Sequence, residues 1–108
     1  MSRLEQLENL LKDSPGDSFL LFALAKEFEG RQNDEKALGY YQQLVSADPN
    51  YVGLYYHLGK LLERLGQFPE AFSTYTTGME VARSQGDQHA LNELAGARLE
   101  LGDEEDFA

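Results

Sequence analysis

The sequence predicts an all-α fold of about six helices, built as antiparallel helix–turn–helix repeats. Apolar residues recur at the three- and four-residue spacing of a helix face, most clearly from Tyr51 to Met79. No segment shows the sustained two-residue alternation, rich in β-branched residues, that is typical of a strand. The pattern also returns after 34 residues, which indicates a repeated structural unit.

The first half of the chain divides into three expected helices. Four leucines form one face of a helix over residues 2–14, and Pro15 ends it because the residue before a proline avoids helical geometry. A second helix, Ser18–Gly30, carries an apolar stripe and is aromatic on a second face. The third runs to about Ala47, and Asp34 is expected to cap its N-terminus.

The second half follows the same plan. A helix is expected over Tyr51–Leu65, and Pro69 suits the first turn of the next helix, where its missing N–H costs little. A break at residues 84–87 precedes a last helix over about Gln88–Leu101. The acidic residues after Gly102 are expected to be frayed.

Residues that lie 34 positions apart match in size and polarity. Pro15 corresponds to Pro49 at this offset. Five further pairs follow it: Leu21 with Tyr55, Leu24 with Leu58, Phe28 with Leu62, Ala37 with Ala71, and Tyr41 with Tyr75. As a set, these positions resemble the tetratricopeptide repeat family, whose 34-residue unit is a pair of helices.

The resemblance implies one tetratricopeptide repeat domain over residues 1–102, stacked as a short right-handed α–α superhelix. Its expected parts are an N-terminal half-repeat helix (2–14), two repeat units (18–51 and 52–85) and a C-terminal capping helix (87–101). An acidic tail (103–108) follows them.

Composition limits the classes of function. A chain of 108 residues with 42% apolar content is expected to form one compact domain. The absence of cysteine removes disulfides, thiolate metal sites and cysteine nucleophiles. The formal net charge of −10 disfavours nucleic acid and anionic membranes as partners. Because no apolar stretch is long enough for a membrane span, we expect a cytoplasmic protein.

The sequence shows no constellation of residues for catalysis. His57 and His89 have no partner at metal-ligand spacing, and no phosphate-binding glycine loop is present. The acidic run Glu104–Asp106 lacks the fixed oxygen ligands of a tight cation site. We therefore expect no enzymatic activity, no cofactor and no bound metal.

The family resemblance implies that the first helix of each repeat lines a concave peptide groove. The residues at the matching positions are Phe19, Phe22, Lys26, Tyr56, His57, Lys60 and Arg64, with His89 on the last helix. An aromatic ring one turn from a lysine recurs in both units, and it offers a stacking surface beside an ammonium that binds a carboxylate. The family's carboxylate clamp is not reproduced, because Phe22 stands where its first lysine would be.

The lysines of the groove have a second interpretation, as parts of surface ion pairs. The recurring pairs Lys26 with Glu29 and Lys60 with Glu63 have the i,i+3 spacing of ion pairs on a solvated helix face, which need no ligand.

The function we expect is a protein–protein interaction module or adaptor that binds a peptide segment of a partner protein. The alternative is a structural or assembly protein that self-associates through its terminal helices. A homo-oligomer is possible, and a stable dimer that buries the end helices favours this alternative over the peptide-binding module.

Overall fold

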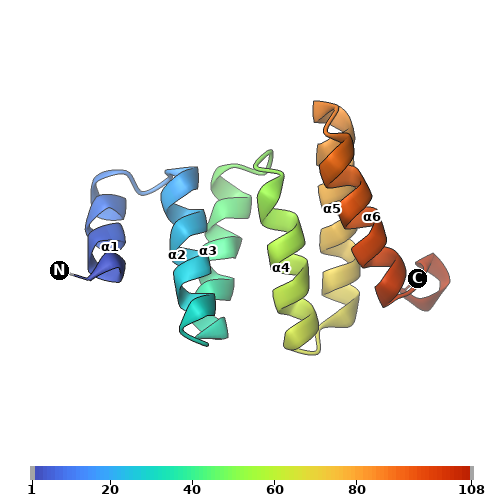
Figure 1. The fold of residues 1–108 in the computed structure, drawn as a ribbon, viewed down its shortest axis with the longest axis horizontal. Helices are drawn as coiled ribbons and strands as arrows, with labels where there is room; N and C mark the ends of the chain where they lie inside the picture. The colour runs from blue at the N-terminus through green and yellow to red at the C-terminus, as the bar shows by residue number, and fades with distance from the viewer. Residues whose placement is uncertain (1, 108) are drawn as a thin grey trace. The chain divides into compact units, whose positions relative to one another are not determined.

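The computed structural model describes residues 2–107, which form six α-helices and one short 3-10 helix without any strand (Figure 1). The helices are α1 (Arg3–Asp13), α2 (Ser18–Gly30), α3 (Asp34–Ala47), α4 (Gly53–Arg64), α5 (Phe68–Gln85), α6 (Gln88–Leu101) and η1 (Glu104–Phe107). The all-α prediction is confirmed, and α2 and α6 begin and end where the sequence predicted. Within the described range, no helix combines the length and the apolar character that crossing a membrane requires.

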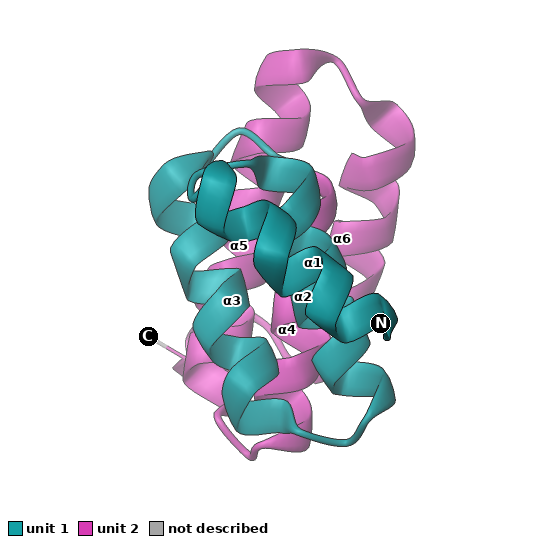
Figure 2. Cartoon of the chain, turned by 90° about the vertical axis from the view of Figure 1, so that its left-hand side faces the viewer, with its two compact units in different colours: residues 1–51 teal, residues 52–108 magenta. Residues whose placement is uncertain are grey.

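The helices group into two compact units, residues 1–51 and 52–108, which Figure 2 colours separately. In unit 1, α2 packs against both α1 and α3. In unit 2, α4, α5 and α6 pack against one another. The boundary between the units falls after Tyr51, where the sequence period separates the two repeat units. The prediction that both units form a single domain stays a prediction.

The 34-residue period is visible in the core of each unit. Ala37 and Tyr41 of α3 are fully buried, and so are their counterparts Ala71 and Tyr75 of α5. The other pairs are buried alike, with exposed fractions of 6% or less: Leu21 with Tyr55, Leu24 with Leu58, and Phe28 with Leu62. The repeated positions therefore hold each helix pair together, as the sequence predicted.

The starts of α3 and α4 differ from the sequence predictions. Asn33, not Asp34, caps α3: its side-chain oxygen accepts the N–H of Lys36 at 3.2 Å. The capping residue must lie just outside the helix, and Asp34 is already its first residue. Helix α4 begins at Gly53 instead of Tyr51: the N–H of Tyr55 bonds to the carbonyl of Val52 at 3.3 Å, and Tyr51 belongs to the preceding turn, where its N–H bonds to the carbonyl of Asp48.

The turns inside the two helix pairs are built alike. Gly66 ends the turn after α4 with a left-handed φ of +75°, and Gln32, one period earlier, has φ of +60°. In each turn the following N–H bonds to a helix carbonyl at 2.9 Å, from Asn33 to Phe28 and from Gln67 to Leu62. The geometry of the turn thus places Gln32 in a left-handed conformation that glycine adopts without steric cost.

The acidic tail is ordered, so the expectation of fraying is wrong for residues 103–107. The Asp103 carboxylate accepts the N–H groups of Glu105 at 3.0 Å and Asp106 at 3.3 Å, which holds the turn of η1. The Phe107 ring then stacks on Phe72 of α5, with ring centroids 4.7 Å apart. An apolar contact of this kind stabilises a short segment that its charges alone would leave mobile.

Candidate functional site

The predicted groove residues are divided between the two units. Phe19, Phe22 and Lys26 lie on α2 in unit 1. The other five belong to unit 2: Tyr56, His57, Lys60 and Arg64 on α4, and His89 on α6. Each set is therefore a surface of its own unit.

In unit 1 all three predicted residues line one cavity of about 360 Å³. Its remaining lining residues are Arg3, Ala23, Glu27 and Tyr51. Helix α2 presents this face because its opposite stripe is buried against α3, so the spacing of apolar residues decides which side chains stay outside. Three predicted positions are thus brought together around a single hollow.

Aromatic rings form the apolar part of this cavity. Phe19 is 66% exposed, which is unusual for so large an apolar side chain. Phe22 is half-buried: its ring meets the edge of Tyr41 at 6.3 Å and tilts against Tyr51 at 5.4 Å, measured between centroids. Phe22 therefore has a packing role as well as a place in the cavity, whereas Phe19 contributes exposed apolar surface.

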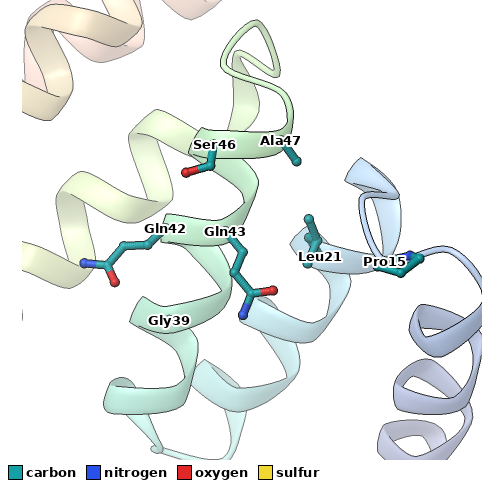
Figure 3. A pocket seen from close by; sticks show the side chains of 7 residues that line it. All are labelled: Pro15, Leu21, Gly39, Gln42, Gln43, Ser46 and Ala47. Carbon is teal, nitrogen blue, oxygen red and sulfur yellow. The ribbon is translucent and has the colours of Figure 1, made fainter.

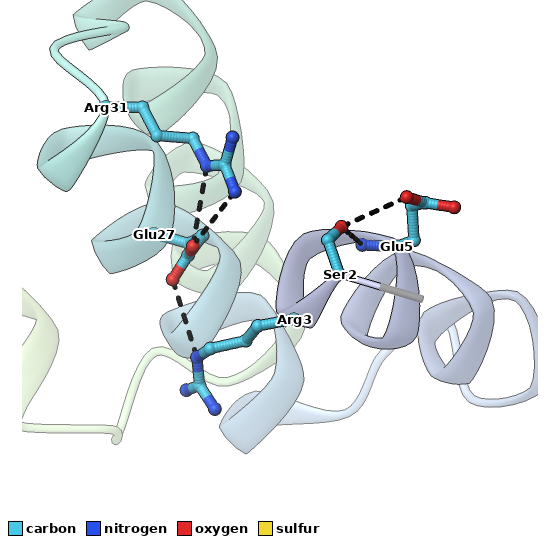
Figure 4. Close-up of polar contacts among 5 residues, drawn as sticks. All are labelled: Ser2, Arg3, Glu5, Glu27 and Arg31. Atoms are coloured by element: carbon cyan, nitrogen blue, oxygen red, sulfur yellow. Dashed lines mark hydrogen bonds and ion pairs between the residues drawn. The ribbon is translucent and has the colours of Figure 1, made fainter.

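A carboxylate with two guanidinium partners lies beside the rings. Glu27 pairs with Arg3 at 3.4 Å through one oxygen and with Arg31 at 3.4 Å through the other (Figure 4). Arg3 is held at the start of α1, where Ser2 caps the helix by accepting the N–H of Glu5. Arg3 was not among the predicted groove residues, because it lies on α1 and no spacing in the sequence connects it with α2.

In unit 2 the predicted residues on α4 form an aromatic and cationic cluster. The Tyr56 and His57 rings meet edge to face at 5.8 Å, and the Lys60 ammonium lies 5.6 Å from the centre of the Tyr56 ring. Tyr56, His57 and Lys60 thus lie together on α4, all partly exposed. Arg64 lies one turn further along α4 and is exposed, and His89 is exposed in the first turn of α6.

The two lysines of the predicted surfaces have the same surroundings in both units. Lys26 pairs with Glu29, and Lys60 with Glu63, each at 3.7 Å. The same glutamate oxygen accepts a hydrogen bond from a buried tyrosine one helix away: Tyr41 donates to Glu29, and Tyr75 to Glu63. The predicted i,i+3 ion pairs are confirmed, and the tyrosine that fixes each of them is a feature that spacing did not reveal.

The environment of Tyr75 changes its acid–base behaviour. Burial, then the hydrogen bond to Glu63 and the charge of that carboxylate, raise the pKa of Tyr75 well above its ordinary value of 10.0. An unfolded chain therefore loses the tyrosine proton at a lower pH than the folded chain does. The stabilisation is complete below about pH 10 and is lost as the pH rises through the folded pKa.

We accordingly expect the urea midpoint of the wild-type chain to fall between about pH 9 and about pH 11. The Tyr75→Phe variant lacks the ionising group, so its midpoint is expected to fall less over the same range. Far-UV circular dichroism during urea titration measures both midpoints. Equal losses in the two proteins would contradict the assigned role of Tyr75.

A larger hollow lies elsewhere on unit 1, outside the predicted set. Its volume is about 550 Å³, and Figure 3 shows the side chains around it. The lining residues are Pro15, Leu21, Gly39, Gln42, Gln43, Ser46 and Ala47, none of them charged. This hollow lacks both the exposed aromatic ring and the cations of the Phe19 cavity, and we do not assign it a ligand.

Comparison with known proteins finds similarity to tetratricopeptide repeats. The tetratricopeptide repeat family model matches residues 40–72. The crystal structure of a tetratricopeptide repeat domain protein from Salinibacter ruber is 48% identical, with a TM-score of 0.76 over 79% of this chain and 96% of that chain. A solution structure from the same organism is also 48% identical, with a TM-score of 0.77 over 81% and 88% of the two chains.

A solution structure of a Bordetella parapertussis protein is 28% identical and has a TM-score of 0.79, covering 94% of this chain and 88% of that chain. No curated protein matches the chain. The similarity to solved structures therefore extends over most of the sequence and agrees with the 34-residue period.

Proposed function

We propose that this chain, which belongs to the tetratricopeptide repeat family, is an adaptor that binds a peptide segment of a partner protein. Tetratricopeptide repeats in general mediate protein–protein interaction, and the family is typically non-catalytic. The finer proposal concerns the place of binding. We assign it to the surface of Phe19, Phe22 and Lys26 in unit 1, with Tyr56, His57, Lys60, Arg64 and His89 as the corresponding surface of unit 2.

The observation that carries this proposal is the cavity of about 360 Å³ beside the exposed Phe19 ring. It combines three aromatic rings with the cations Arg3 and Lys26, so it offers apolar contact and hydrogen-bond donors within one hollow. Aromatic anchors in a pocket with a polar rim are typical of protein interfaces. A peptide side chain of moderate size fits this arrangement better than a small charged metabolite does.

Self-association remains the second candidate function, and two exposed leucines favour it. Leu10 on α1 is 54% exposed and Leu99 on α6 is 75% exposed. Both are large apolar side chains on the first and last α-helices, where the alternative places its contacts. Light scattering over a range of concentrations tests it: a stable dimer that Leu10→Glu and Leu99→Glu dissociate would support this second function.

A selection from a random peptide library tests the groove. We expect the tightest selected peptides to bind Phe19→Ala at least about tenfold more weakly, because truncating a central aromatic anchor removes about 1.4 kcal/mol or more. Phe68→Ala is the matched control, since it also truncates an exposed phenylalanine but lies outside the cavity. Equal affinities for the wild type and Phe19→Ala would overturn the assignment.

A further inference from the structure

We propose that the groove selects against acidic segments and prefers a neutral or basic segment with an apolar anchor. The proposal rests on the proposed function and adds the chemistry of the partner. The geometry that carries it is the repeated chain of a buried tyrosine, a glutamate and a surface lysine: Tyr41, Glu29 and Lys26 in unit 1, and Tyr75, Glu63 and Lys60 in unit 2.

Each lysine already has a counter-ion that belongs to the protein. The ammonium of Lys26 lies 3.7 Å from Glu29, and that of Lys60 lies 3.7 Å from Glu63. A surface ion pair alone is weak, because two long side chains must be ordered to form it. Here the glutamate carboxylate accepts a hydrogen bond from the hydroxyl of a fully buried tyrosine. The glutamate side chain is therefore already ordered, and only the lysine loses freedom when the ion pair forms.

An incoming carboxylate would meet this fixed negative charge. If it approached the lysine ammonium to about 4 Å, it would lie about 6 Å from the glutamate, and Coulomb repulsion would offset roughly two-thirds of the attraction. Glu27, the anionic residue among those that line the cavity, is likewise fixed between Arg3 and Arg31. Two of the three cations at or beside the cavity, Arg3, Lys26 and Arg31, are therefore compensated before any partner arrives.

The remaining attraction comes from the rings and from the charge of the whole chain. Phe19, Phe22 and Tyr51 offer apolar contact that does not depend on the charge of the partner. The formal net charge of −10 repels an acidic segment at long range and attracts a basic one. The rings therefore favour an aromatic or aliphatic anchor, and the net charge favours neutral or basic residues beside it.

The experiment uses the full chain and the tightest peptide from the library selection, synthesised in three forms with flanking Lys, Gln or Glu residues. For the wild type we expect the affinity to fall in the order Lys, Gln, Glu. Glu29→Gln removes the fixed counter-ion of Lys26, so it is expected to strengthen binding of the Glu-flanked form by about two- to fivefold. Tyr41→Phe keeps the ring and removes the hydroxyl that holds Glu29, so a smaller change in the same direction is expected.

Glu35→Gln is the matched control, because it removes the same charge from an exposed position at the start of α3. A Glu-flanked peptide that binds the wild type most tightly would overturn the charge preference while leaving the groove in place. Equal effects of Glu29→Gln and Glu35→Gln would also overturn it, since only net charge would then matter. A selection that yields no binding peptide removes the proposed function, and this inference falls with it.

Discussion

Replacing Gly59 with alanine is expected to lower the free energy of unfolding by about 3 kcal/mol. The added Cβ would lie 2.1 Å from Cε1 and 2.6 Å from Cζ of the Tyr75 ring, far inside van der Waals contact. The ring has no room to retreat, because Tyr75 is fully buried and its hydroxyl is bonded to Glu63. The helices α4 and α5 must therefore move apart, which costs packing along the whole pair.

Gly39→Ala is the control for this prediction. Gly39 also lies inside a helix, but nothing is within 4 Å of the position its Cβ would take. Alanine there is expected to stabilise the chain by about 0.5–1 kcal/mol through helix propensity alone. Urea denaturation followed by far-UV circular dichroism compares the two variants. A stabilising effect at both positions would show that Gly59 does not set the distance between α4 and α5.

Tyr41→Ala is expected to cost about 4 kcal/mol, because it removes a fully buried ring from the core of unit 1. The loss has two parts, the cavity left by the ring and the hydrogen bond to Glu29. Tyr41→Phe separates them, since it keeps the ring and loses the hydroxyl, and we expect it to cost about 1 kcal/mol.

The same denaturation experiment measures both tyrosine variants, and the exposed Leu99→Ala serves as a control for a truncation outside the core. If Tyr41→Phe were as costly as Tyr41→Ala, the hydroxyl rather than the ring would dominate. If neither variant lost stability, the repeated tyrosine position would not be part of the core, and the 34-residue period would lose its physical explanation.

The sequence predicted the helices well because several of their ends are marked by residues with a local conformational effect. Pro15 ends the first helix, and the Gly86 cap with φ of +69° ends α5, so these two helix ends can be predicted without knowledge of the tertiary structure. The exact start of α3 was missed, because Asn33 and Asp34 are both good capping residues and only the backbone path decides between them.

The candidate site was predictable only in part. The family resemblance placed Phe19, Phe22 and Lys26 on one helix face, and these residues do line one cavity, whereas peptide binding there stays a prediction. Arg3 and Tyr51 also line the cavity, but both lie outside α2. The spacing of residues along α2 therefore does not indicate that they belong to the site. The stacking of Phe107 on Phe72 was missed for the same reason, since contacts between distant residues leave no local signal.

Amide chemical shifts of the isotope-labelled chain, followed as a selected peptide is added, show where the peptide binds. If the groove is the binding site, the largest shifts will lie at Phe19, Phe22, Lys26 and Tyr51, and Phe19→Ala will abolish them. If the shifts instead gather at Gln42, Gln43 and Ser46 around the larger hollow, and survive Phe19→Ala, the peptide binds elsewhere and the proposed groove is wrong.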